Sequence, residues 1–279
     1  MYSKMQTVKL VTIMVAFFAV IIFPINSYAS HSWNNYHWAR TSNPFTLKVV
    51  DSNTSDWDGE LGLARADWST STVLDLTPET GSDLSRDRKR CVMISGKIRS
   101  CNAAYGSNGW LGLASINISG SHITQGSSKM NDSYFIYGDG TNNGYNETNR
   151  RHVMCQEIGH TLGLGHTSED GSDQNTCMDY SNDLGNPSPN SHDYQQLASI
   201  YSHTDSSTTI AFSSFSGSPS DVTDDPNSWG KLTSQSANGR SSTYEREHFD
   251  GSRTATHVFW TEERAEVCRG CDHRYHDDH

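Results

Sequence analysis

The fold is decided by the stretch Gln156-Glu157-Ile158-Gly159-His160-Thr161-Leu162-Gly163-Leu164-Gly165-His166. Its Glu, His, Gly and second His have the spacing of the pattern H-E-x-x-H-x-x-G-x-x-H, but Gln156 stands where that pattern has its first His. Residues four apart share one helix face, so two such side chains can hold one metal ion while the Glu faces its water. Gly163 then ends the helix, and the chain turns back to deliver His166. The stretch therefore predicts a metal site on a helix, with the first ligand changed.

Gln156 has three open interpretations. Its amide oxygen is a weaker zinc donor than imidazole, which would leave a weaker but working site. His152 lies one turn earlier and could compensate, but it would sit about 12 Å from His160 along the helix axis, which disfavours this. Alternatively, the metal site is lost and the chain is a binding scaffold. The remaining motif residues favour a working metal site.

A second signal follows shortly after His166, in Cys177-Met178-Asp179-Tyr180. Together, the two stretches resemble the metzincin clan of zinc endopeptidases, which carry the long zinc motif and then a Met-turn beneath the metal. The segment from Asn190 to Tyr201 resembles the closing helix of the matrixin branch. The resemblance covers roughly residues 40–203 and leaves out the C-terminal segment.

The resemblance implies an α+β fold. We expect a metzincin-like catalytic domain with a twisted, mixed five-stranded sheet and two long helices. The zinc-site helix would be followed by the Met-turn and a C-terminal helix. Hydrophobic periodicity predicts strands near 45–49, 73–76, 92–98, 113–118 and 122–130, and helices near 56–69, 148–162 and 193–201.

Matched position by position, the resemblance implies a role for each motif residue. Glu157 would be the general base and acid, and the zinc ligands would be Gln156, His160 and His166. Met178 would pack under the site without binding the metal. Tyr180 would steady the oxyanion, although an ordinary core or surface Tyr is an equal alternative. The strand with Leu113, Ala114, Ser115 and Ile116 would be the sheet edge that pairs with an extended substrate.

The expected function is that of a secreted zinc-dependent endopeptidase, with Zn²⁺ as cofactor and structural Ca²⁺ as a further candidate. The alternative is a catalytically weak or inactive secreted binding protein on the same fold. A third hypothesis is an exported metal-binding protein whose His-rich tail matters most.

The 279-residue chain begins with features of an export signal. Lys4 and Lys9 precede an apolar run, and Ser27-Tyr28-Ala29 offers small residues for cleavage. We therefore expect a signal peptide at 1–29, a catalytic domain at 30–203, a Ser/Thr/Gly/Asp-rich linker at 204–227 and a C-terminal extension at 228–279. The protein would be extracellular or periplasmic.

Charge and cysteine content narrow the partners and the compartment. A net charge of −11 without a basic stripe argues against nucleic acid and anionic membranes. We expect a monomer without a membrane anchor that acts on an extracellular protein or peptide. In an exported chain, six cysteines favour disulfides over metal ligands. The candidates are Cys91, Cys101, Cys155 and Cys177; a Cys155–Cys177 bridge would tie the site helix to a later loop, but sequence leaves the pairing open.

Overall fold

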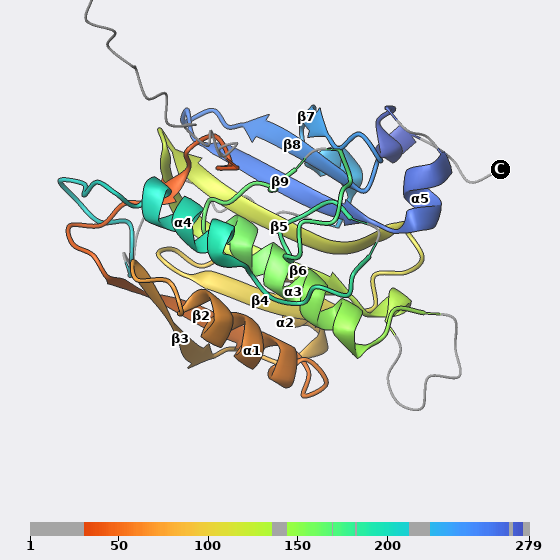
Figure 1. Ribbon diagram of the computed structural model, residues 1–279, viewed down its shortest axis with the longest axis horizontal. Helices are drawn as coiled ribbons and strands as arrows, with labels where there is room; N and C mark the ends of the chain where they lie inside the picture. Colours follow the sequence, from red (N-terminus) through yellow and green to blue (C-terminus); the bar gives the residue numbers. More distant parts are fainter. Residues whose placement is uncertain are drawn as a thin grey trace, which may run out of the picture.

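The chain is built around one mixed β-sheet, shown for the computed structural model in Figure 1. The structure describes residues 31–135, 144–168, 170–181, 183–211, 224–267 and 270–275. The expected signal peptide and part of the expected linker lie outside these residues. Within them the sheet has nine strands in the order β3-β2-β4-β6-β5-β9-β8-β7, and β1 also pairs with β6.

The first six strands form the mixed half of the sheet. Strands β2, β3, β4 and β6 run parallel along it, β1 pairs parallel with β6, and β5 is antiparallel to β6. Their bounds are His37–Trp38 for β1, Phe45–Ser52 for β2, Leu74–Thr80 for β3, Ile98–Ala103 for β4, Trp110–Ser119 for β5 and His122–Asn131 for β6.

Helices α1, α3 and α4 lie on one face of this sheet (Figure 1). Their bounds are Asp58–Trp68, Glu147–Thr161 and Ser191–Ile200, and the short helices α2 and α5 span Ser85–Arg90 and Glu262–Val267. Helix α1 buries Leu61, Ala64 and Trp68 against the core. The indole of Trp68 donates to the Cys155 carbonyl oxygen at 3.0 Å, which fixes α1 against α3.

The C-terminal segment continues the sheet. Strands β7 (Lys231–Gln235), β8 (Ser241–Glu247) and β9 (Arg253–Trp260) are all antiparallel, and β9 pairs with β5. The segment has its own apolar layer on the sheet face away from α3, where Trp110 and Leu113 of β5 pack with Trp229, Val258 and Trp260. This segment is therefore an integral part of the fold.

The predicted fold class was wrong. The sheet has nine strands where five were expected, and the chain is rich in β-structure instead of being dominated by two long helices. Most elements before residue 201 fall close to their predicted ranges, but the strand expected near 92–98 was misplaced, since β4 spans Ile98–Ala103, and β1 and α2 were not predicted. Of the four additional strands, β1 is the short pair His37–Trp38, and β7, β8 and β9 lie after residue 228. The aromatic residues of this last segment indicate burial, but they do not indicate which earlier strand it pairs with.

Two disulfides lie in the described part of the chain. Cys91 is bonded to Cys101, and Cys155 of α3 is bonded to Cys177 in the loop before α4. Cys271 is also disulfide-bonded, so it offers no thiolate for a metal. None of the described helices is long and apolar enough to cross a membrane.

Candidate metal centre

Helix α3 positions the central residues of the site. Asn146 caps it through a reciprocal pair of hydrogen bonds with Asn149, which satisfies donors at the first turn. Gly163 follows the helix with φ +91°, and a side chain there would collide with the Tyr36 carbonyl oxygen. The chain can therefore reverse direction immediately after the helix and bring His166 back beside His160.

His160 and His166 lie together at the end of α3, with ring centroids 4.5 Å apart. Nδ1 of His160 donates to the Leu164 carbonyl oxygen at 2.9 Å, so its Nε2 carries the lone pair. The Nε2 atoms of both residues are buried and have no hydrogen-bond partner among the described residues. Buried, unpaired acceptor nitrogens are costly unless a ligand satisfies them.

The third imidazole of the site comes from β9. His257 lies 3.9 Å from His160 and 4.8 Å from His166, measured between ring centroids. Each of the three residues offers one ligand atom, and these atoms all lie within 4.8 Å of one another. His257 faces α3 because side chains alternate along β9, so that Ala255 and Phe259 point to the same core.

Contacts on both nitrogens hold His257 in place. Nε2 lies 2.8 Å from the Ser241 hydroxyl oxygen, and Nδ1 lies 3.3 Å from Oε2 of Glu157. Nδ1 is thus the nitrogen directed toward the motif helix. His257 lies on β9, which pairs antiparallel with β5 and places His257 opposite Ala114.

Burial keeps the three imidazoles neutral. Burial lowers the pKa of His160 and of His257 to about 3, and it also lowers the pKa of His166 well below its ordinary value. Neutral imidazole is the form that binds a metal. Three histidines are also a known ligand set for catalytic zinc. The residues present therefore fit a zinc ion.

Glu157 is fully buried beside the three histidines. Burial raises the pKa of its carboxyl group to about 8, while His160 and the Ala114 N–H act to lower it. Its Oε1 has no hydrogen-bond partner among the described residues. Gly112 makes room for it, because a side chain there would come within 2.6 Å of Oε1.

Gln156 serves as a structural link. Its Nε2 donates to the carbonyl oxygens of Cys177 at 2.9 Å and Asp179 at 3.1 Å, so both amide hydrogens hold the loop that carries Met178. Its Oε1 is buried without a partner among the described residues. The amide fixes α3 to this loop in parallel with the Cys155–Cys177 disulfide.

Met178 and Tyr180 both lie close to the end of α3 and its histidines. Met178 is buried under α3, where Gly159 leaves space for its thioether: a side chain at Gly159 would come within 2.6 Å of Sδ. The Tyr180 ring lies 3.8 Å from the His166 ring, measured between centroids.

A cleft of about 210 Å³ opens onto the site. Its lining includes residues 31–34, Thr233, Ser234 and Thr243 of β7 and β8, and His160, His166, His257 and Tyr180. The cleft is therefore bounded in part by the C-terminal strands.

The expected substrate-binding edge is not an edge in this structure. Leu113, Ala114, Ser115 and Ile116 of β5 are paired with β6 on one side and with residues 255–258 of β9 on the other. The backbone groups that were to hold a substrate are occupied by the chain itself. Strand β7 ends the sheet on this side.

Comparisons with known proteins place few limits on this chain. No protein-family model matches it, and no curated protein does either. Solved structures that resemble it include one described as "Structure of myroilysin", with 13% identity over 62% of this chain and 98% of that chain, at a TM-score of 0.36. The identity and TM-score are too low for this likeness to bear on function.

Sequence reasoning missed His257. The motif predicted Glu157, His160 and His166 correctly as neighbours, but nothing near His257 marks it as a ligand. The chain has 13 histidines, and His257 lies about 90 residues beyond His166 in an ordinary alternating strand. The sequence contained one indirect indication of a further ligand. The motif has three histidines, and Gln156 replaces the first of them, so a third imidazole had to come from elsewhere in the chain.

Proposed function

We propose that the chain is a zinc-dependent peptidase whose ligands are His160, His166 and His257. The observation that carries this proposal is the convergence of three neutral imidazoles, two with unpaired Nε2 atoms, beside the buried carboxyl group of Glu157. His257 takes the ligand role that the motif gives to its first His, and Gln156 holds the neighbouring loop.

Zinc bound here would act as a Lewis acid that activates water for attack on a carbonyl carbon. Glu157 would take the proton of the attacking water at Oε1 and later deliver it to the leaving amine. Oε1 of Glu157 has no hydrogen-bond partner among the described residues, so it is the oxygen that would meet the attacking water. Tyr180, beside His166 in the cleft, is placed to steady the oxyanion.

A peptide substrate fits the surroundings of the cleft. Thr233 and Ser234 lie on β7, the last strand of the sheet on this side, and they line the entrance. An extended peptide can add to a free sheet edge through backbone hydrogen bonds. We expect the substrate to approach along β7 because β5 is already paired.

Glu157→Gln tests this function. The variant keeps the three histidines, so it should bind zinc like the wild type while peptide hydrolysis falls about 10²–10⁴-fold through loss of the general base. Glu147→Gln, at the exposed start of α3, is the matched control and should leave turnover unchanged. Hydrolysis of casein with and without chelator is the measurement. Equal turnover in Glu157→Gln and wild type would rule out the proposal.

A second candidate is a latent or inactive binding protein, and one observation favours it. Strand β9 occupies the edge of β5 and places His257 against the carboxylate of Glu157. In that case His257 would block the site instead of completing it. The two candidates predict opposite effects of removing the His257 imidazole.

A further inference from the structure

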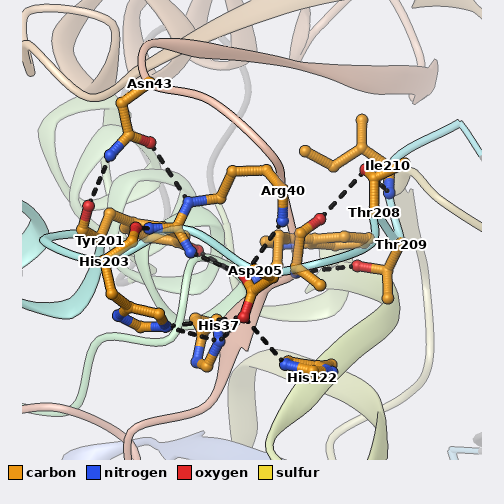
Figure 2. A network of polar contacts seen from close by, with 12 residues as sticks. His37, Arg40, Asn43, His122, Tyr201, His203, Asp205, Thr208, Thr209 and Ile210 are labelled. Atoms are coloured by element: carbon orange, nitrogen blue, oxygen red, sulfur yellow. Dashed lines mark hydrogen bonds and ion pairs between the residues drawn. The ribbon is translucent and has the colours of Figure 1, made fainter.

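A second group of histidines lies away from the proposed catalytic site. It gathers His37 at the start of β1, His122 at the start of β6, and His203 and Asp205 in the segment after α4 (Figure 2). Strands β1 and β6 pair in parallel with His37 opposite His122, so the backbone register itself places these two rings side by side. Three segments of the chain thus meet at one carboxylate.

Three imidazole nitrogens converge on one oxygen atom. Oδ1 of Asp205 lies 3.2 Å from Nε2 of His122, 3.5 Å from Nε2 of His37 and 3.7 Å from Nε2 of His203. The Nε2 atoms of His37 and His203 are themselves 3.2 Å apart. Ligand atoms about 2.0–2.1 Å from a tetrahedral zinc ion lie roughly 3.3 Å from one another. The distances that join His37, His203 and Asp205 are therefore close to those of a tetrahedral ligand set.

Hydrogen bonds alone do not account for this arrangement. Nδ1 of His37 lies 2.9 Å from the Asn35 carbonyl oxygen and must donate to it, so the neutral ring presents a lone pair at Nε2. His203 in its Nε2–H tautomer can donate to that lone pair, but Oδ1 of Asp205 can only accept, so no hydrogen bond joins it to Nε2 of His37. A cation bound by the His37 lone pair and the carboxylate oxygen would turn the repulsion between these two acceptors into attraction. The bond to Asn35 is also the outer contact that commonly orients a metal-binding imidazole.

Arg40 leaves the required oxygen free. Its guanidinium Nη1 and its backbone N–H both donate to the other oxygen of Asp205, Oδ2, at 3.0 and 3.1 Å. The guanidinium carbon lies 4.7 Å from the centre of the Tyr201 ring, so the arginine is itself held in place. The carboxylate is thus oriented with Oδ1 toward the histidines.

Exposure allows a metal ion to enter. The side chains of His122 and His203 are 36% and 49% exposed, whereas those of His37 and Asp205 are 8% and 10% exposed. Burial is also the largest factor that lowers the pKa of His203, which favours its neutral form. Because the donors are mainly imidazoles, they suit zinc and its transition-metal neighbours better than calcium or magnesium.

We propose that His37, His203 and Asp205 form a second site for a divalent transition-metal ion of the zinc type, with His122 as a hydrogen-bond donor to Oδ1 of Asp205. Its role is structural. The segment after α4 is already held to the N-terminal strand by backbone and side-chain contacts between Ala39 and Thr209. The ion would add a link from this segment to β1 and β6.

The test separates this site from the proposed catalytic centre. A parent variant carrying His160→Ala and His166→Ala lacks the first site, and Co²⁺ is titrated into the metal-free parent while visible absorbance and bound metal per chain are followed. We expect the parent to bind Co²⁺ with the spectrum of a tetrahedral nitrogen and oxygen site. Adding His203→Ala should remove one equivalent and this spectrum, and Asp205→Asn should weaken binding at least 10-fold.

His248→Ala in the same parent is the matched control. The imidazole of His248 contacts Thr254 and none of the proposed ligands, so this variant should leave Co²⁺ binding unchanged. Far-UV circular dichroism checks that each variant is folded. His37→Ala is the second variant should His203→Ala fail to fold, because it removes another of the three ligands. Equal Co²⁺ stoichiometry and spectra in the parent and the folded cluster variants would overturn the proposal.

Discussion

At the scale of single residues, burial dominates the chemistry of this chain. His160 and His257 are held neutral by burial, and Glu157 is held near a pKa of about 8 by the same cause. Gln156 shows how a substituted motif position can take another task, since its amide joins α3 to the following loop. The motif predicted which residues would be neighbours, but it could not predict the role of an amide whose partners are backbone carbonyls.

His152 provides a prediction at this scale. It is fully buried, its Nδ1 donates to the Asn186 carbonyl oxygen at 2.9 Å, and burial lowers its pKa from 6.5 to about 4. At pH values between about 4 and 6.5, His152 is protonated in the unfolded chain and neutral in the folded chain. Its contribution to stability is therefore present above about pH 6.5 and is lost as pH falls toward about 4.

His152→Asn keeps a donor for Asn186 and removes the titration. In metal-free protein, we expect the loss of unfolding free energy between pH 6.5 and 4 to shrink by at most about 3 kcal/mol relative to wild type. Urea unfolding at a series of pH values measures this loss. His248→Asn, on a less buried ring, should change it little. An unchanged pH dependence in His152→Asn would contradict the burial argument.

At the scale of elements, α3 and the loop after it behave as one unit. The disulfide Cys155–Cys177 and the Gln156 amide both connect them, and Met178 fills the space under Gly159. The prediction of α3 was close, although every residue from His152 to Thr161 is buried and the helix has no single buried face there. Hydrophobic periodicity could not predict β9 as the neighbour of β5, since many alternating strands would satisfy that edge equally well.

The two described disulfides should differ in what they support. Replacing both Cys155 and Cys177 with Ala should cost about 2–4 kcal/mol of stability and should also weaken zinc binding, because the loop behind the site is released. Replacing Cys91 and Cys101 with Ala is the matched control. Their bridge joins positions 10 residues apart in the sequence and includes no residue of the histidine site. It should lower stability while zinc affinity stays the same.

Urea unfolding and competition with a chelating dye provide the two measurements. Equal loss of zinc affinity in both double variants would mean that the Cys155–Cys177 bridge has no special connection to the site. An unaltered affinity in both would lead to the same conclusion, with the histidines held by α3 and β9 alone.

At the scale of the whole molecule, the first and last strands of the described chain belong to one sheet. Strands β7, β8 and β9 close the edge of β5 and supply His257, so the C-terminal segment is part of both the core and the candidate site (Figure 1). Sequence patterns act over short separations and predicted the local elements well. The pairing of β5 with β9 joins residues more than 130 positions apart, and it depends on shape and burial that no local pattern records.

The most direct test of the three-histidine centre is to measure zinc affinity and peptide hydrolysis in His257→Ala. If His257 is the third ligand, zinc affinity should fall by more than the roughly 10–100-fold lost on removing an outer-shell partner, and hydrolysis should fall with it. His248→Ala should match the wild type in both. If His257→Ala retained its zinc and hydrolysed peptides faster than the wild type, His257 would be a blocking residue, and the three-histidine centre would be contradicted.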